Sequence, residues 1–230
     1  MSLKDDLNSE VAKIFKSTWT KRDGQVVPES DDIKLDNDAV LLEGTVLYAD
    51  LDESTNLVDK YKPAFAAEMY KAYLHCVAKI ITAEGGVITS YDGDRIMAVF
   101  IGDDKNSNAA RTALKINWVR ENIINSAIKN QYPKDNCSIS QVVGIDTSPL
   151  FVARTGIRGS NDLVWVGRAA NYAAILSSRS GPPSQITEVV YNRLNDKSKI
   201  DQNGTNMWQK NTAAELGYST IYTSTWWWEL

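Results

Sequence analysis

The sequence has very few of the residues that form disulfides or zinc sites in small proteins. Its 230 residues include two cysteines, Cys76 and Cys137, and a single histidine, His75. These numbers give no sign of a disulfide framework or of a Cys/His metal site, so we interpret both cysteines as free thiols. A single histidine beside a cysteine in a helical stretch is typical of a packing residue. Carboxylates, arginines or bound metal ions must therefore carry any chemistry.

The sequence also lacks a long hydrophobic run and an excess of positive charge. No apolar segment approaches the ~18 residues of a membrane span, and the mixed-charge start of the chain differs from a secretory signal. With 25 basic and 29 acidic residues, the formal net charge of -4 disfavours non-specific binding of nucleic acid. We expect a cytoplasmic protein with neither a nucleic-acid nor a membrane partner.

Residues 1–40 differ from the rest of the chain and are interpreted as an N-terminal extension of helix and loop. Apolar residues recur at helical spacing from Leu7 to Phe15, and residues 18–30 are typical of a loop because they include Gly24 and Pro28. The patterns from residue 41 to residue 228 are stronger, and we assign this region to the main domain.

The main domain alternates short strands with amphipathic helices. Asp92-Gly93 between two apolar strands is a strong signal for a two-residue hairpin. The order β-α-β-β-α-β predicts an α+β fold of the ferredoxin-like, split βαβ type, with a mixed, mostly antiparallel sheet. The predicted elements are strand 45–50, a helix from about 63 to 84, strands 87–91 and 95–101, helix 108–129, a hairpin of 138–145 with 150–154 around Thr147-Ser148-Pro149, helix 167–178, an ambiguous segment 184–190, and a last hairpin of 205–210 with 219–227.

Two aspartates are the most informative residues of the main domain. Asp50 ends the first predicted strand and Asp94 lies at the tip of the hairpin, so we expect their carboxylates to meet at one edge of the sheet. Two such carboxylates repel each other unless a cation lies between them. Mg²⁺ and Mn²⁺ take oxygen ligands and share them with substrate phosphates. Ser54 and Thr55 open the next helix, where backbone N–H groups suit a phosphate.

Three short segments occur in an order and at a spacing that mark a known family. They are Asp50-Leu51-Asp52-Glu53-Ser54-Thr55, Tyr91-Asp92-Gly93-Asp94 and Gly167-Arg168-Ala169-Ala170-Asn171-Tyr172-Ala173-Ala174. Together they resemble the signature blocks of the class III nucleotide cyclases, and the resemblance covers residues 43–225. The lead-in, residues 22–40 with 48–51, is similar to the pyrimidine-cyclase branch that serves bacterial anti-phage (Pycsar) defence.

The resemblance implies a mechanism, position by position. Asp50 and Asp94, assisted by the Leu51 carbonyl, would hold two divalent ions, Mn²⁺ or Mg²⁺. One ion would activate the ribose 3′-OH and the other would bind the triphosphate, with pyrophosphate leaving after in-line attack on the α-phosphorus. Asn171 matches the asparagine that positions the ribose, which in this family comes from the partner protomer. The active unit would be a homodimer with sites at its interface, and residues 41–228 would be the nucleotide cyclase catalytic domain.

Two departures from the purine-selecting members point to the substrate. Those members carry a lysine where this chain has Ser90, and an aspartate or similar acceptor where it has Val164. A buried base edge needs matching polar partners. A chain that lacks both of these polar side chains therefore lacks the groups that recognise a purine. Tyr91 and Trp165 lie beside these positions and would narrow the pocket for a smaller ring. We expect a pyrimidine nucleoside triphosphate. The branch resemblance favours UTP to 3′,5′-cyclic UMP, and CTP to cyclic CMP stays open.

A further departure concerns the charge that develops on the α-phosphate. The family's transition-state arginine falls at Ile175 in this chain, so another cation must supply its charge. Arg168, about one helical turn before Asn171, is our candidate. Arg154, Arg158 and Arg179 are the alternatives.

Two other functions fit some of the same residues. The segment from Asp50 to Ser54 also matches the opening motif of haloacid-dehalogenase-like phosphatases, with Asp50 as nucleophile and Asp52 as general acid. Against this function, the distal acidic motif would come too soon, at residues 102–104, and no doubly wound α/β pattern surrounds it. The second alternative is a degenerate cyclase fold that binds a nucleotide without turnover, which Ile175 supports.

Two features bear on partners. The branch resemblance implies that the cyclic product is a second messenger read by a separate effector protein. Trp226-Trp227-Trp228 near the end of the chain is unusual, and we expect it to form a sheet edge or a dimer contact rather than a ligand site.

Overall fold

The computed structural model describes residues 2–230, which divide into two compact units. We call Gly44–Ser148 together with Arg168–Leu230 the body. We call the residues up to Glu43 together with Pro149–Gly167 the arm. None of the helices formed by the described residues is long and apolar enough to cross a membrane.

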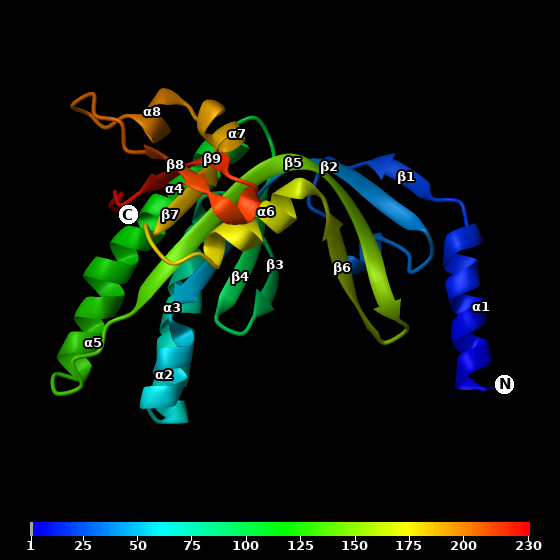
Figure 1. Cartoon of the computed structure of the whole chain (residues 1–230), viewed down its shortest axis with the longest axis horizontal. Helices are drawn as coiled ribbons and strands as arrows, with labels where there is room; N and C mark the ends of the chain where they lie inside the picture. The colour runs from blue at the N-terminus through cyan, green and yellow to red at the C-terminus, as the bar shows by residue number, and fades with distance from the viewer. Residues whose placement is uncertain (1) are drawn as a thin grey trace. The chain divides into compact units, whose positions relative to one another are not determined.

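The chain forms a mixed sheet with strand order β3-β4-β2-β5-β7-β9-β8, and the body holds most of it (Figure 1). The pairs β2–β4, β3–β4, β7–β9 and β8–β9 are antiparallel, while β5 and β7 are parallel. This agrees with the predicted α+β fold. The strands are β2 (Asp38–Asp52), β3 (Val87–Asp92), β4 (Arg95–Phe100), β5 (Ser140–Ile157), β7 (Ser184–Thr187), β8 (Gln209–Ala213) and β9 (Ser219–Ser224).

Two long helical segments cover the sheet and bury its core. Tyr73, Val77 and Ile81 recur every four residues on one face of α3 and are buried against the sheet strands. Pro63 occupies the first turn of α3, where its missing N–H costs no hydrogen bond. The helices are α2 (Ser54–Lys60), α3 (Pro63–Ala83), α4 (Lys105–Val119) continued by a π turn (Arg120–Ile124) into α5 (Asn125–Gln131), α6 (Arg168–Ser177), α7 (Glu188–Asn192) and α8 (Asp196–Lys199), with a 3₁₀ turn at Ala214–Leu216.

Helix α6 approaches β5 very closely. A Cβ atom at Gly144 of β5 would lie 2.2 Å from the carbonyl oxygen of Ala173 and 2.5 Å from the backbone nitrogen of Ser177. Only glycine therefore allows this contact. Leu176 of α6 packs with Ile221 of β9 in a second, smaller core cluster.

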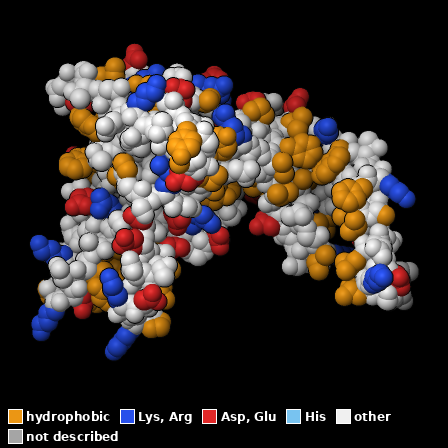
Figure 2. All heavy atoms as spheres, viewed as in Figure 1, with side chains coloured by type: hydrophobic (Ala, Val, Ile, Leu, Met, Phe, Trp, Pro, Cys, Tyr) orange, Lys and Arg blue, Asp and Glu red, His pale blue; other side chains and the backbone are white. Residues whose placement is uncertain are grey.

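The arm contains one α-helix and four strand segments. It comprises α1 (Leu3–Lys16), β1 (Thr20–Asp23), a 3₁₀ turn (Ser30–Asp32), the start of β2, and the hairpin of β5 with β6 (Ser160–Val166). Strand β1 pairs with β2 in parallel, and Arg22 joins the two through an ion pair with Asp38 at 2.7 Å. Figure 2 shows apolar side chains on the surface of α1. The predicted N-terminal helix is thus confirmed, whereas the loop expected at residues 18–30 contains the strand β1, which its pairing with β2 holds extended.

One predicted hairpin is wrong. Residues 138–145 and 150–154 belong to a single strand, β5, and the chain reverses at Arg158-Gly159 instead. Thr147 had the character of a turn residue, but its hydroxyl donates to the Gly44 carbonyl at 3.1 Å and accepts from the Thr45 hydroxyl at 3.1 Å. These contacts with β2 keep the segment extended.

The other differences are smaller. Asp92 pairs with Arg95, so the hairpin turn is Gly93-Asp94 rather than Asp92-Gly93, and Gly93 takes the positive φ of 61°. The ambiguous segment 184–190 is a strand followed by a helix. The last hairpin is β8 with β9, which ends at Ser224. The largely antiparallel sheet also argues against the doubly wound phosphatase.

Candidate active site

The pairing of β2 with β4 brings Asp50 and Asp94 to the same end of the sheet. Ala49 of β2 pairs with Ile96 of β4. Asp50 follows this last pair on one strand, and Asp94 precedes it by two residues in the β3–β4 turn. Both side chains are partly buried, so each carboxylate is only partly hydrated.

The pKa of Asp50 shows how the site acts on its charge. This pKa is raised from 3.8 to about 6, chiefly by burial and next by the negative charge of Asp94. Arg95 and a hydrogen bond from the Leu51 backbone lower it, and Asp92 has a small raising effect. The site therefore disfavours two unneutralised carboxylates.

The residues present fit a hard divalent cation. Oδ2 of Asp94 is buried and has no hydrogen-bond partner within residues 2–230. A buried carboxylate oxygen without a hydrogen-bond partner costs free energy, and so does the repulsion between two neighbouring carboxylates. A cation that takes oxygen ligands would remove both of these costs. Residues 2–230 contain no cluster of three or more His, Cys, Asp or Glu side chains able to hold a metal. The protein ligands would be Asp50, Asp94 and a backbone carbonyl such as that of Leu51.

Three residues that sequence reasoning missed surround Asp50. Nη1 of Arg95 lies 4.0 Å from Oδ2 of Asp50, and its Nη2 lies 3.2 Å from Oδ2 of Asp92. The guanidinium also lies 5.5 Å from the centre of the Tyr48 ring. The buried Tyr73 hydroxyl donates to the Asp50 carbonyl at 3.4 Å. Tyr48 precedes Asp50 by two residues on a strand, so the two-residue period could have identified it.

Four of the residues predicted to contact substrate belong to the body and lie on α2 and β3. Ser54 begins α2 and is half-buried, while Thr55 is exposed. Ser90 and Tyr91 lie on β3, next to a register shift between Ile88 and Ser90. Tyr91 is 57% exposed, which leaves its ring available to a ligand. Their roles toward triphosphate or base stay predictions.

Val164 and Trp165 lie on β6 of the arm. Val164 is exposed and Trp165 is half-buried. They pair with Ala153 and Val152 of β5, so the hairpin fixes their backbone positions. Their contribution to base selection also stays a prediction.

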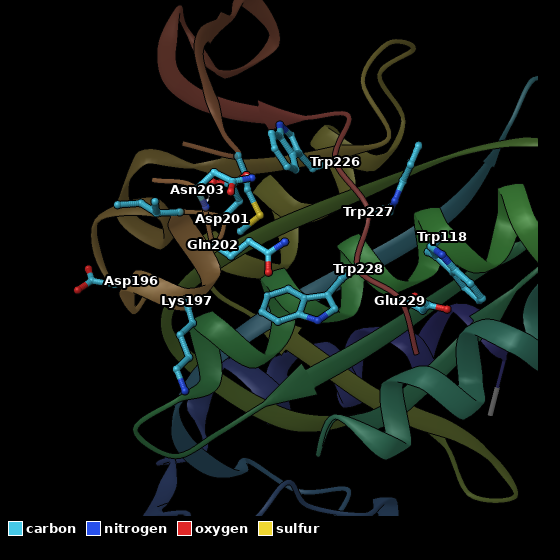
Figure 3. A pocket seen from close by; sticks show the side chains of 12 residues that line it. Trp118, Asp196, Lys197, Asp201, Gln202, Asn203, Trp226, Trp227, Trp228 and Glu229 are labelled. Carbon is cyan, nitrogen blue, oxygen red and sulfur yellow. Dashed lines mark hydrogen bonds between the residues drawn. The ribbon is translucent and has the colours of Figure 1, made fainter. Parts of the chain in front are cut away.

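A hollow of about 980 Å³ lies beside the C-terminal tryptophans and includes none of the predicted site residues (Figure 3). The tail there is tied to α4, because the Trp228 backbone N–H donates to the Leu114 carbonyl at 3.2 Å, and the Asn117 amide donates to the Trp226 carbonyl at 3.0 Å. Of the two expected roles of the tryptophans, the sheet edge is wrong, since β9 ends before them, and the dimer contact stays a prediction. The lining residues are Trp118, Asp196, Lys197, Ile200, Asp201, Gln202, Asn203, Met207, Trp226, Trp227, Trp228 and Glu229.

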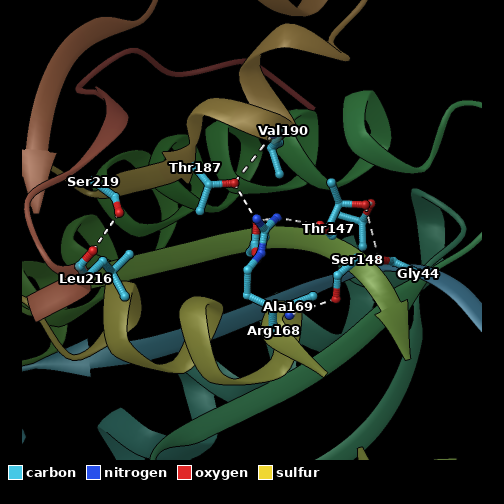
Figure 4. A network of polar contacts seen from close by, with 11 residues as sticks. Gly44, Thr147, Ser148, Arg168, Ala169, Thr187, Val190, Leu216 and Ser219 are labelled. Atoms are coloured by element: carbon cyan, nitrogen blue, oxygen red, sulfur yellow. Dashed lines mark hydrogen bonds and ion pairs between the residues drawn. The ribbon is translucent and has the colours of Figure 1, made fainter. Parts of the chain in front are cut away.

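Arg168, the candidate for the missing transition-state arginine, is held by a buried carboxylate (Figure 4). Its Nε and Nη2 lie 2.9 and 3.1 Å from the two carboxylate oxygens of Asp146, which is fully buried. Nη2 also donates to the Thr147 carbonyl at 2.9 Å. The Thr187 hydroxyl donates to Asp146 at 2.5 Å, and the Tyr172 ring lies 5.3 Å from the guanidinium. These contacts fix the first turn of α6.

Asn171 lies one turn further along α6 and is exposed. An exposed amide on a helix whose start is fixed is suited to reach a group outside its own protomer. Its role toward ribose stays a prediction. Ile175 is half-buried and packs against the smaller core cluster, so no charge stands there.

Comparison with known proteins assigns the family. No family model matches the chain. It is 52% identical to a uridylate cyclase of Xanthomonas perforans over 231 residues, which span 100% of both chains. It is also 50% identical to a uridylate cyclase of Burkholderia cepacia over 99% of both. The chain belongs to the uridylate cyclase family.

Solved structures show that this uridylate cyclase family member has the class III cyclase fold. An adenylyl cyclase from P. aeruginosa superposes with a TM-score of 0.66 and 21% identity, over 81% of this chain and 95% of that one. A guanylyl cyclase superposes with a TM-score of 0.67 and 19% identity, over 82% and 94%. At such identities the likeness establishes the fold alone.

The other arginines that we considered already have partners or lie far along a hairpin in this family member. Arg154 donates to the Asn161 side chain at 2.6 Å and lies 3.2 Å from Asp31. Arg179 donates to the Gln185 side chain at 2.7 Å. Arg158 is exposed where the β5–β6 hairpin reverses. By contrast, Arg95 forms an ion pair with Asp50, with 4.0 Å between Nη1 and Oδ2.

Proposed function

We propose that this member of the uridylate cyclase family converts UTP into 3′,5′-cyclic UMP and pyrophosphate. Two relatives that match the chain along its full length at 50% identity or more are uridylate cyclases. The observation that carries the proposal is the pair Asp50 and Asp94, with one buried carboxylate oxygen left without a partner. Residues 41–228 would form the catalytic domain.

Asp50, Asp94 and the Leu51 carbonyl would hold two divalent ions, Mn²⁺ or Mg²⁺. When bound, such ions lower the pKa of the ribose 3′-OH and neutralise the charge of the triphosphate. The two carboxylates contribute the negative potential that attracts cations, and their partial burial keeps competing water away. Ser54 and Thr55 would offer backbone N–H groups to a phosphate.

Arg95 would balance charge at this site. Without a cation, its guanidinium lies between Asp50 and Asp92 and partly neutralises both. A cation between the carboxylates would weaken its attraction to Asp50, and the guanidinium would then be available to the substrate. Its place over the Tyr48 ring limits the directions in which it can turn.

The active unit would be a homodimer. Asn171 would position the ribose from the partner protomer, as the family resemblance implies. Its exposure on α6 supports this role, and the Arg168–Asp146 contact would hold that helix in place. Arg168 would offset charge on the α-phosphate only with the part of its guanidinium that Asp146 leaves accessible, and its side chain is 41% exposed.

Base selection would depend on Ser90 and Tyr91 of the body and on Val164 and Trp165 of the arm. Ser90 and Val164 replace the polar groups that read purines, and the two aromatic residues would favour a smaller ring. CTP is the alternative substrate, because uracil and cytosine differ at one edge only. The product would act as a second messenger for a separate effector protein in anti-phage defence within the cytoplasm.

Incubation of the purified chain with UTP and Mn²⁺ tests the proposal. We expect cyclic UMP and pyrophosphate in equal amounts, identified by mass. Asp50→Asn and Asp94→Asn should each lower the rate by about 100-fold or more, since each loses several kcal/mol of charge stabilisation. Asp52→Asn is the matched control and should stay active. Loss of activity in Asp52→Asn with release of inorganic phosphate from the parent chain would favour the phosphatase chemistry instead.

A nucleotide-binding dimer without turnover is the second candidate. The observation that favours it is the engagement of Arg168 by Asp146 together with the apolar residue at position 175. Calorimetry that shows Mn²⁺-dependent UTP binding, while no cyclic product forms, would support this candidate.

A further inference from the structure

The hollow of about 980 Å³ beside the C-terminal tail contains none of the residues assigned to the proposed reaction. All of the residues that line it belong to the body. Four of the chain's seven tryptophans are among them, namely Trp118, Trp226, Trp227 and Trp228. Tryptophans are enriched among the residues that contribute most of the binding energy at protein interfaces. Their concentration in one hollow indicates a binding site.

Hydrogen bonds hold the walls of the hollow in place. Oδ1 of Asp201 accepts from the backbone N–H groups of Asn203 at 2.9 Å and Thr205 at 2.7 Å, which closes the loop that forms one wall. In the other wall, the Trp228 backbone N–H and the Asn117 amide tie the tail to α4. A preformed site loses little conformational freedom on binding, so more of its contact energy is expressed as affinity.

The tryptophan rings of the tail are available to a ligand. Figure 3 shows Trp226 and Trp228 pointing from the tail toward the loop that carries Asp201 and Gln202. Trp226 is 36% exposed and Trp228 is half-buried. Among residues 2–230, no lysine or arginine lies over either ring and no other aromatic ring stacks on them. The face of an indole ring attracts cations, so these rings can accept one from outside the chain.

The charge of the lining also favours a cation. Asp196, Asp201 and Glu229 stand against Lys197, so negative charges exceed positive charges by two. No ion pair within residues 2–230 includes Asp196, Lys197 or Glu229. A hydrogen bond from the Thr205 backbone lowers the pKa of Asp201, so this carboxylate stays ionised at neutral pH. The hollow therefore presents uncompensated negative charge beside free aromatic faces.

We propose that this hollow binds an arginine-bearing peptide segment of a partner protein, with the guanidinium packed against the Trp226 and Trp228 rings beside Asp201. A guanidinium is planar, stacks on aromatic faces and is more weakly hydrated than the ammonium group of lysine. The volume is at the upper end of the range of about 300–1,000 Å³ for ligand pockets, which is more than one side chain fills. The exposed Gln202 amide offers the donor and the acceptor that a peptide group needs.

The lining disfavours two other occupants. A nucleotide would bring phosphate charge into a hollow that is already negative. A second copy of this chain, in an isologous contact, would place two identical negative surfaces opposite each other. The dimer contact predicted for the tryptophans is therefore the less favourable use of this surface, and the titration described next distinguishes it from peptide binding.

Titration of the full chain with the peptide acetyl-Arg-Gly-Arg-amide, followed through the indole N–H resonances by nuclear magnetic resonance, tests the proposal. We expect saturable shifts of the Trp226 and Trp228 resonances at millimolar peptide, with the Trp19 resonance of the arm unchanged. The same peptide with lysine in place of arginine should bind more weakly, and the version with glutamine should not bind. Methylguanidinium should also bind more weakly, because it lacks the peptide groups.

Variants of the rings test their contribution. Trp226→Leu and Trp228→Leu should each raise the dissociation constant of the arginine peptide at least about fivefold. Trp19→Leu is the matched control, because Trp19 is 40% exposed against 36% for Trp226 and lies in the arm. Trp228 also packs against the main core, so an unchanged circular dichroism spectrum is required of each variant.

A charge variant tests the carboxylates without altering the rings. Asp201→Asn combined with Glu229→Gln removes both excess negative charges, and Asn at position 201 keeps an oxygen for the loop hydrogen bonds. This double variant should bind the arginine peptide at least about fivefold more weakly at low salt. Glu10→Gln with Asp59→Asn makes the same change in net charge at exposed positions outside the hollow and should bind like the parent.

Several results would overturn the proposal. They are the absence of saturable shifts with the arginine peptide, equal binding of the glutamine peptide, and ring and charge variants that bind like the parent. Equal affinity for methylguanidinium would show that a free small cation is the occupant, and shifts that grow with protein concentration in the absence of peptide would show a second copy. Turnover of UTP does not enter the titration, so this site and the proposed reaction can fail separately.

Discussion

Nη1 of Arg95 lies 4.0 Å from Oδ2 of Asp50, and the same guanidinium reaches Asp92 at 3.2 Å. One arginine is thus shared between a candidate metal ligand and the exposed aspartate that ends β3. Arg95 lowers the pKa of Asp50, but burial and the charge of Asp94 outweigh it and leave that pKa at about 6. Without a cation, the site therefore holds negative charge that the fold does not fully compensate.

We expect Asp50→Asn to stabilise the metal-free chain at pH 8. The pKa of Asp50 is about 6 in the folded chain and 3.8 for the free side chain, so the folded state binds this proton more tightly. The stability from this group is present below pH 3.8 and is lost as the pH rises through 6. The neutral amide should raise the free energy of unfolding by roughly 2 kcal/mol at pH 8 and hardly at all near pH 4. Urea denaturation at both pH values measures this, and an equal change at both would contradict it.

The same pKa predicts how Mn²⁺ binding depends on pH. A cation must displace the proton from Asp50, so affinity should be constant above pH 7 and fall about tenfold per pH unit well below 6. Titration of the chain with Mn²⁺, followed by electron paramagnetic resonance, measures the affinity directly. Asp52→Asn, a nearby acid outside the candidate ligands, should leave this dependence unchanged. An affinity that does not change between pH 7 and pH 5 would show that Asp50 is not a ligand.

Arg168 and Asp146 should contribute unequally to stability. Arg168→Gln leaves the fully buried Asp146 carboxylate without its counter-charge, which costs about 3 kcal/mol. Asp146→Asn leaves an arginine that is 41% exposed and can be hydrated, so we expect a loss of only about 1 kcal/mol. Thermal and urea denaturation of both variants measure the difference. An Arg168→Gln protein as stable as the parent would contradict the structural role of the pair.

Base selection should change when the residue types of the purine-selecting members are placed at positions 90 and 164. Ser90→Lys combined with Val164→Asp should lower kcat/KM for UTP at least about tenfold, equivalent to about 1.4 kcal/mol, because the two new polar groups would face a base edge that does not match them. The control pair Ser90→Ala with Val164→Ile adds no polar group and should keep the parent's preference. Steady-state kinetics with UTP and ATP measure both. Unchanged selectivity in the Lys/Asp variant would exclude these positions from base reading.

Local patterns predicted the elements that position the carboxylates. The apolar run before Asp50 indicates a strand and the glycine at position 93 a tight turn, through the chemistry of adjacent residues. The strand itself is longer than the predicted 45–50, because β2 runs from Asp38 to Asp52. The spacing of four from Tyr73 to Ile81 gave α3 for the same reason. The family resemblance, and not the local pattern, supplied the substrate class and the roles of Asn171 and Arg168.

Long-range contacts account for what the sequence did not predict. Thr147-Ser148-Pro149 has the local composition of a turn, but hydrogen bonds to Gly44 and Thr45, about a hundred residues away, keep it extended. The buried Asp146 pairs with Arg168, which follows it by twenty-two residues, and neither the helical nor the strand period indicates this pairing. Arg95 is close to Asp50 only because β2 and β4 are neighbours in the sheet.

The central claim is that this chain cyclises UTP at a cation site formed by Asp50 and Asp94. One reaction with Mn²⁺ and equal concentrations of UTP, CTP, ATP and GTP, with cyclic products resolved by mass, tests it most directly. We predict that cyclic UMP is the main product, that cyclic CMP is minor, and that both are lost in Asp50→Asn and Asp94→Asn. A cyclic purine as the main product, or cyclic UMP formed at the parent's rate by either variant, would contradict the account.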